Sequence, residues 1–219
     1  MSESARSVLL LGATGLVGRE ILRQLLGDST VARVVALTRR PLEDIALADK
    51  LRNEVVDFDR LADHGELFAV EQIFSALGTT IKKAGSQDAF RRVDFEMPLA
   101  AATLGVQHGV KDFLLVSALG ASAGSRVFYN RVKGELEDAL RSLPFRSVTI
   151  VRPSLLLGDR ADWRIGEEVA KRFGWLAPGR YKPVRASRVA AALVAAAQHP
   201  EPGMCIIESD ELQRFPADG

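Results

Sequence analysis

The chain has 219 residues, of which 47% are hydrophobic and 26% are charged, with a formal net charge of +1. This length and balance are typical of a globular protein with a full hydrophobic core, so we expect residues 1–219 to form one domain. The near-neutral charge argues against a basic nucleic-acid-binding patch, and the single cysteine, Cys205, excludes an internal disulfide.

The N-terminal apolar run "VLLLGA" is too short for a membrane span, and it lacks the apolar region of a signal peptide. A single cysteine also fits a reducing compartment. We therefore expect a cytoplasmic protein whose partner is a small molecule, without nucleic acid or membrane.

Short β-branched runs alternate with longer helical stretches along the chain. The runs expected to be strands span residues 7–12, 33–38, 53–58, 71–77, 112–118, 147–153 and 203–209. The helices expected between them span residues 15–28, 97–109, 129–142 and 186–198. Most strand runs are nearly continuous in apolar residues, which indicates strands covered on both faces. The sequence therefore predicts an α/β protein with a doubly wound parallel sheet, in which the irregular segment at about 157–185 is a small C-terminal substrate lobe or lid.

The first strand run leads into "GATGLVG", residues 12–18, which opens the first helix. Gly12 would allow a tight turn, Gly15 would let a pyrophosphate approach the backbone, and Gly18 would let the helix pack closely. The helix amino terminus would add free N–H groups and a favourable dipole. This context predicts a Rossmann fold that binds a dinucleotide, with a merely structural turn as the alternative. The residues expected to contact the cofactor here are Gly12, Ala13, Thr14, Gly15, Leu16, Val17 and Gly18.

The end of the second strand run indicates which dinucleotide would bind. An NAD site usually has an acidic residue there for the ribose 2′-hydroxyl, whereas this chain has Arg39 and Arg40. Two guanidinium groups suit a 2′-phosphate, so we expect NADP(H) in preference to NAD(H), with solvated arginines as the alternative. Asp57, after the third run, could reach the adenine amino group. The loop "SALGTT" after the fourth run would place Leu77 and Gly78 against the cofactor ribose, unless it is a plain glycine-containing loop.

The fifth strand run ends near Ser117, at the carboxyl edge where open α/β sheets bind ligands. On the following helix, Tyr129 and Lys133 would lie four residues apart on one face. An ammonium close to a phenol favours the phenolate and lowers a pKa that starts near 10, which suits proton transfer. Ser117 could orient the substrate oxygen, and Lys133 could also bond the nicotinamide ribose. The alternative is a solvated helix pair without a chemical role.

Taken together, these residues resemble the short-chain dehydrogenase/reductases of the extended and atypical branch, and more closely the Tat-interacting-protein-like oxidoreductases. The matching stretches are "GATGLVGRE", "TRRP", "LGTT", "VKGE" and "RPSLLLGDR". The resemblance implies a 2′-phosphate contact for Arg39 and Arg40. It also implies that the segment after "RP" meets the cofactor, which points to Leu156 and Arg164. Where the wider superfamily often has an asparagine that holds a water for proton relay, this chain has Asp94.

The sequence thus predicts an NADP(H)-dependent oxidoreductase that transfers a hydride between nicotinamide and a small carbonyl or hydroxyl substrate. The alternative class is an NADP(H)-binding regulatory or scaffold protein with little or no turnover. The Tyr129–Lys133 pair favours the enzyme, because a sensor has no chemical need for it. No metal is expected, because the three histidines are far apart in the chain.

Overall fold

The computed structural model describes residues 5–42, 49–157 and 179–217. Seven strands form one sheet in the order β3-β2-β1-β4-β5-β6-β9, and all neighbouring strands in it are parallel. The strands are β1 (Arg6–Leu11), β2 (Val31–Thr38), β3 (Leu51–Val55), β4 (Gln72–Ser75), β5 (Asp112–Val116), β6 (Ser147–Arg152) and β9 (Gly203–Glu208). An order that runs outward in both directions from β1 is the Rossmann topology. The expected doubly wound parallel sheet is confirmed.

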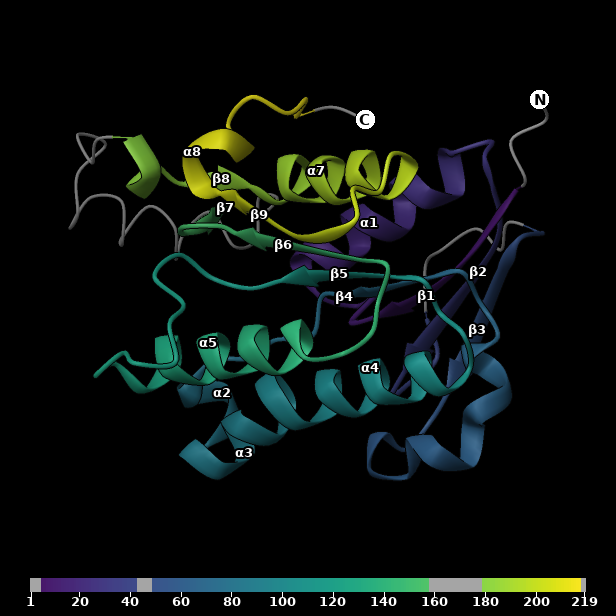
Figure 1. Cartoon of the computed structure of the whole chain (residues 1–219), viewed down its shortest axis with the longest axis horizontal. Coiled ribbons are helices and arrows are strands. Elements are labelled where there is room, and N and C mark those ends of the chain that lie inside the picture. Colours follow the sequence, from purple (N-terminus) through teal and green to yellow (C-terminus); the bar gives the residue numbers. More distant parts are fainter. Residues whose placement is uncertain (1–4, 43–48, 158–178, 218–219) are drawn as a thin grey trace.

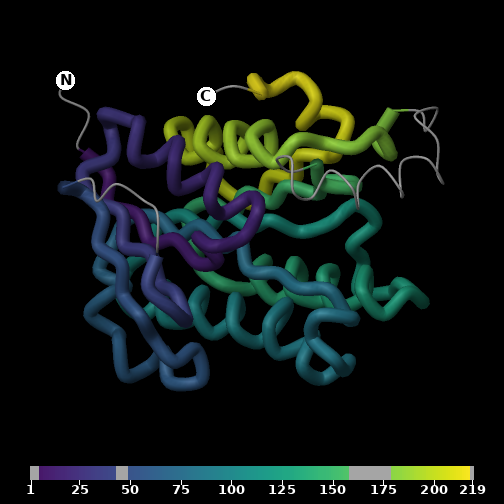
Figure 2. Tube along the Cα trace, turned by 180° about the vertical axis from the view of Figure 1, so that it is seen from behind, coloured from purple at the N-terminus to yellow at the C-terminus, as the bar shows by residue number. Residues whose placement is uncertain are grey.

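Helices cover both faces of this sheet (Figure 1). The α-helices are α1 (Leu16–Gly27), α2 (Ile81–Ala84), α3 (Gln87–Arg91), α4 (Met97–Gln107), α5 (Phe128–Arg141), α7 (Ala186–Gln198) and α8 (Ser209–Leu212). The 3-10 helices η1 (Phe58–Phe68) and η3 (Gly179–Tyr181), the π-helical turn η2 (Arg92–Glu96), and the short parallel pair β7 (Leu156–Leu157) and β8 (Val184–Arg185) complete the described elements. Helices α1 and α7 lie on one face and α4 and α5 on the other, and the view from behind in Figure 2 shows the same layers.

The inner strands of the sheet are largely buried on both faces, as their continuous apolar runs indicate, whereas the edge strands β3 and β9 are partly exposed. In β1, Val8 and Leu10 join the core beneath α1 and α7. Leu9 and Leu11 point the other way, into the core beneath α4 and α5. All four are fully buried, which explains why the strand lacks the alternation of a half-exposed one.

All seven expected strands and all four expected helices are present in the structure, with differences of a few residues at their ends. The expected strand at 71–77 stops at Ser75, because the chain then turns against Gly12. The structure adds elements that the sequence does not predict, namely η1, α2, α3, η2, η3, α8 and the β7–β8 pair. Each is too short or too irregular to show a helical or a strand period. Most of the proposed lobe at 157–185 lies outside the described residues.

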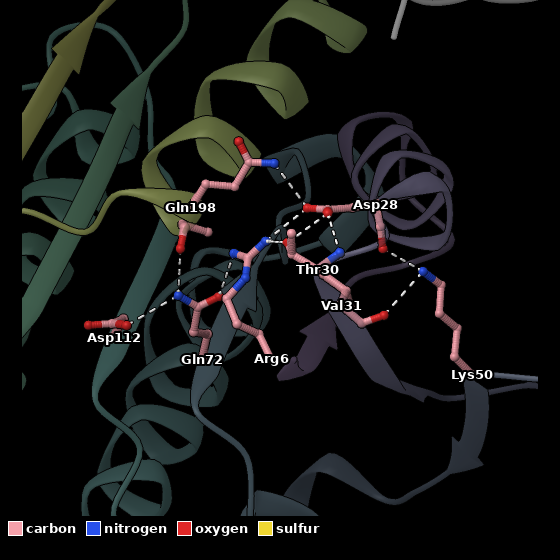
Figure 3. Close-up of polar contacts among 9 residues, drawn as sticks. Arg6, Asp28, Thr30, Val31, Lys50, Gln72, Asp112 and Gln198 are labelled. Carbon is pink, nitrogen blue, oxygen red and sulfur yellow. Dashed lines mark hydrogen bonds and ion pairs between the residues drawn. The ribbon is translucent and has the colours of Figure 1, made fainter. Parts of the chain in front are cut away.

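The amino edge of the sheet, where the strands begin, is closed by a network of polar side chains (Figure 3). Arg6 donates to Gln72 at 3.1 Å and to Asp28 at 2.8 Å. Gln72 donates to Asp112 at 3.2 Å, and Arg146 donates to Asp112 at 2.9 Å and 2.5 Å. A cavity of about 630 Å³ opens beside this network. Its buried polar side chains, Gln72 and Asp112, already have partners, which indicates a structural role for the amino edge.

Candidate dinucleotide site at the carboxyl edge

The glycine loop between β1 and α1 is shaped by two close backbone approaches. Gly12 has a positive φ of 82°, and a Cβ there would lie 2.5 Å from the Ala76 carbonyl oxygen at the end of β4. A Cβ on Gly18 would overlap the carbonyl oxygen of Gly12. At Gly15 the backbone is ordinary, and a Cβ would meet only the Gly12 oxygen at 3.3 Å and the Ala76 oxygen at 4.0 Å. Gly12 and Gly18 are therefore required by the fold, whereas Gly15 is exposed and is not required by its backbone conformation.

The amino terminus of α1 is open to a ligand. Gly15 is the N-cap residue, and no side chain caps the helix. The first N–H groups of an α-helix have no partner within the helix, so those of Leu16 and Val17 are available to an anion. Ala13 and Val17 point into the core with 0% and 5% exposure, which leaves only their backbone for such a contact. Thr14 is exposed beside Gly15.

Arg39 and Arg40 follow the carboxyl end of β2 and are both exposed. In the described part of the chain, neither guanidinium has a hydrogen-bond or ion-pair partner. Asp57 follows β3, the neighbour of β2, and its Oδ1 accepts the N–H of Asp59 at 3.0 Å. The two arginines are thus free to meet a phosphate at the outer end of the site, and Asp57 lies at the same edge.

Leu77 and Gly78 connect the glycine loop to the helix that carries Tyr129. A Cβ on Gly78 would lie 3.5 Å from Asp94 Oδ1 and 3.9 Å from Lys133 Nζ. Because Ala76, two residues earlier, lies against Gly12, the loop after β4 runs from the glycine loop to Lys133. The structure therefore brings these separate sequence motifs to one edge of the sheet.

Lys133 is buried on the inner face of α5 and pairs with a carboxylate. Its Nζ lies 2.8 Å from Asp94 Oδ1, and the two side chains are only 4% and 1% exposed. Asp94 Oδ2 accepts the N–H of Thr79 at 2.9 Å. Tyr129 lies one turn before Lys133, half-buried, with its ring centroid 5.4 Å from that of Phe90.

The expected effect of Lys133 on Tyr129 is wrong in its net direction. Burial raises the pKa of the Tyr129 phenol above its ordinary value, and the Asp94 carboxylate raises it further, while Lys133 acts in the expected lowering direction but does not prevail. Burial likewise raises the pKa of Asp94, opposed by Lys133 and by the Thr79 N–H. Because a carboxylate stands beside the ammonium, the pair favours the phenolate much less than a lone lysine would.

Ser117 lies directly after β5, with 5% exposure, and its hydroxyl donates a short hydrogen bond to Glu137. Glu137 is one turn beyond Lys133 on α5, and Arg152 at the end of β6 binds it through two nitrogens at 2.5 Å and 3.2 Å. Arg152 also binds Glu208, at 2.9 Å. The hydrogen-bonded series Ser117–Glu137–Arg152–Glu208 was not predicted from the sequence. Its signal is that Tyr129, Lys133 and Glu137 are spaced by four residues, which places a second charged residue on the same buried face of the helix.

Gly134, next to Lys133, was also missed. A Cβ on Gly134 would overlap the backbone of Ser122 and Ala123. The Ser122 N–H donates to the Asn130 carbonyl at 3.0 Å, so the loop after Ser117 is fastened to the first turn of α5. The glycine costs helix stability but lets this loop pack against the helix.

The remaining sequence-based contact residues lie after β6. Leu156 is half-buried in β7, which pairs with β8. Arg164 lies outside the described residues. Across the described ranges, no helix is long and apolar enough to span a membrane, and no three His, Cys, Asp or Glu side chains gather as metal ligands.

A family model described as NAD(P)H-binding matches residues 12–200, which run from the first glycine of the loop to the end of α7 and just beyond. The chain belongs to this NAD(P)H-binding family. Protein HTATIP2 of Rattus norvegicus is 39% identical over 171 residues, covering 77% of this chain and 70% of the relative. Protein FMP52, mitochondrial, of Candida albicans is 34% identical over 202 residues, covering 88% of each. These relatives confirm the resemblance to the atypical short-chain dehydrogenase/reductases.

Solved structures with the same fold include MoeE5 in complex with UDP-glucose and NAD, with a TM-score of 0.71, 19% identity, and coverage of 94% of this chain and 79% of that one. The UDP-glucose 4-epimerase of Thermotoga maritima has a TM-score of 0.68 and 16% identity, and the match covers 93% of this chain and 77% of that one. At these identities the likeness concerns the Rossmann fold alone.

The family comparison corrects one expectation. FMP52 proteins from three fungi, Candida albicans, Emericella nidulans and Debaryomyces hansenii, are named mitochondrial. The cytoplasmic location that we expected from the sequence is contradicted by these relatives. Its basis was only the lack of an evident signal peptide and the single cysteine.

Proposed function

We propose that this NAD(P)H-binding protein is an NADP(H)-dependent oxidoreductase of the atypical short-chain type, acting on a small carbonyl or hydroxyl compound. The observation that carries the proposal is the buried Lys133 ammonium, which lies beside Gly78 and one helical turn from Tyr129. Burying an ammonium is costly. Lys133 lies where it could contact both a bound dinucleotide and the Tyr129 phenol, so a role in catalysis would explain why a buried lysine is kept there.

The residues at the outer end of the site support NADP(H) over NAD(H). Arg39 and Arg40 are exposed at the carboxyl end of β2, where a 2′-phosphate would lie if the glycine loop holds the pyrophosphate. Guanidinium groups bind phosphate with charge-assisted hydrogen bonds. Leu77, Gly78 and Leu156 would contact the inner half of the cofactor.

A bound nicotinamide would supply or accept the hydride. The Tyr129 hydroxyl would give a proton to a carbonyl oxygen or take one from an alcohol. The Lys133 ammonium has three N–H donors, of which one faces Asp94, so two remain for a ribose hydroxyl and for Tyr129. The Ser117 hydroxyl donates to Glu137, so its oxygen keeps lone pairs to accept a hydrogen bond from a substrate hydroxyl.

The chain has only two tyrosines, which offers a matched control for the test. NADPH consumption should be followed with a panel of small aldehydes and ketones for Tyr129→Phe and for Tyr181→Phe, which changes an exposed tyrosine in η3. Tyr129→Phe should lower the rate about 10²-fold or more, the usual scale for losing a positioned acid. It should leave NADPH affinity nearly unchanged, because the ring remains.

Tyr181→Phe should keep the rate. If both variants turn over like the unchanged protein, Tyr129 is not the acid. If no carbonyl compound is reduced and Tyr129→Phe alters nothing, an NADP(H)-binding regulatory protein becomes the better description.

A further inference from the structure

Asp94 lies in η2, a single π-helical turn inserted between α3 and α4. Such turns widen a helix locally and are frequent at functional sites, because they redirect a side chain. Here the redirected side chain is fully buried, with 0% exposure. A buried carboxylate is unfavourable without a charged partner, and this one has a specific one, the Lys133 ammonium at 2.8 Å.

The two oxygens of Asp94 have separate tasks. Oδ2 accepts the Thr79 N–H, which fixes the carboxylate to the loop after Gly78. Oδ1 lies 2.8 Å from Lys133 Nζ and forms the ion pair. The carboxylate is thus anchored from one side, and its charge is directed at the ammonium.

Among the described residues, few charges face Tyr129. Lys133 reaches it from its own helix and Asp94 from η2, and from α3 it meets the uncharged ring of Phe90. An ion pair between α3 and α5, Arg91 with Glu135, is more exposed, at 38% and 29%.

We propose that Asp94 is a positioning residue that holds the Lys133 ammonium in place and offsets its charge, so that Tyr129 stays a neutral phenol ready to give a proton to a carbonyl substrate. The carbonyl part of this inference rests on the proposed function. The electrostatic part does not, because it concerns the protein before any substrate binds. A buried phenol beside a neutralised ion pair has little reason to ionise, and a neutral phenol is the form that carbonyl reduction consumes.

The test is a titration of Tyr129 in a Tyr181→Phe background, where it is the only tyrosine. Phenolate absorbance in the ultraviolet is followed against pH, without cofactor or substrate. Asp94→Asn keeps the shape of the side chain and can still accept the Thr79 N–H, but it leaves the ammonium unopposed. The titration midpoint should fall by about one pH unit or more.

Glu135→Gln is the matched control, because it removes a carboxylate from a more exposed ion pair of α5, the one with Arg91. It should leave the midpoint unchanged. An Asp94→Asn midpoint that is unchanged or higher overturns the inference, as does an equal fall in both variants.

A second comparison covers the case in which Asp94→Asn does not fold. The double variant Lys133→Met/Asp94→Asn has no charge left in the pair, so its midpoint should lie close to that of the protein that keeps the offset pair. A midpoint about one pH unit or more above that of the intact pair would show that the ammonium is not offset, and would overturn the inference. Because none of these measurements needs turnover, a failure here is separate from a failure to find a substrate.

Discussion

Replacing Lys133 with methionine should destabilise the protein strongly. The change leaves the Asp94 carboxylate buried without its cation, while the side chains of the pair are 4% and 1% exposed and 2.8 Å apart. Removing one partner of a buried ion pair typically costs about 3–5 kcal/mol. The Thr79 N–H at 2.9 Å remains but does not neutralise the charge. Since a domain is stable by only about 5–15 kcal/mol, the loss should be evident.

The double variant Lys133→Met/Asp94→Asn should recover most of that loss. Asparagine can still accept the Thr79 N–H, and no uncompensated charge stays in the interior. Replacing both members of a buried pair by neutral groups of similar volume is often close to neutral. The difference between the single and the double variant therefore measures the cost of the unpaired carboxylate.

The loss of unfolding free energy caused by Lys133→Met should also depend on pH. Burial already raises the pKa of Asp94, and loss of the opposing ammonium raises it further. An acid whose pKa is raised by folding destabilises the folded state above that pKa, and this cost fades as the pH falls through it toward the ordinary value of 3.8. The loss should be full at neutral and alkaline pH and should shrink on acidification.

Urea unfolding with linear extrapolation, at neutral pH and at about pH 5, measures these quantities for the unchanged protein and both variants. The buried-charge reasoning is refuted if the double variant is as unstable as the single one. It is equally refuted if the loss in the single variant is the same at both pH values.

Two further predictions concern the cofactor. Titration calorimetry should show tighter binding of NADPH than of NADH. Arg39→Ala should weaken the binding of NADPH by about 1.5–3 kcal/mol, the range for a hydrogen bond to a charged group, with little effect on the binding of NADH. Equal affinities for the two cofactors would count against the 2′-phosphate assignment. Gly15→Val should abolish binding of both cofactors while circular dichroism remains native, because its side chain would occupy the place where we expect the pyrophosphate to approach the backbone. Gly27→Val, at the far end of α1 where a Cβ meets nothing within 4 Å, should bind normally.

The sequence predicts the fold well because most strands of the sheet are nearly continuous apolar runs, although the edge strand β3 is not. In β1, successive residues such as Val8 and Leu9 serve opposite cores, and no polar residue interrupts them. The glycine loop is equally predictable from the sequence. The positive φ of Gly12 favours glycine, and the close approach of Gly18 to the Gly12 carbonyl leaves no room for a Cβ. These features depend on residues close together in the chain.

The contacts inside the site are harder to predict from the sequence, because the residues that form each pair are far apart in the chain. Asp94 meets Lys133 only through the π-helical turn η2, which has no sequence period of its own. Glu137 meets Arg152 only because β6 runs past α5. The pKa of Tyr129 is raised by burial and by Asp94, which is distant in the sequence. The four-residue spacing on α5 predicts the lowering effect of Lys133, but it does not predict the net direction of the pKa shift.

The polar network at the amino edge should restrict local unfolding of the helices that it joins. Its hydrogen bonds join positions as distant as Asp28 and Gln198, which connects the first βα unit to the last long helix. Contacts of such large sequence separation form only when most of the chain is in place. Once formed, they prevent α1 and α7 from fraying separately at that end, so we expect amide exchange there to require global unfolding. Any breathing that admits a dinucleotide is then confined to the carboxyl edge, with the amino edge serving as its fixed base.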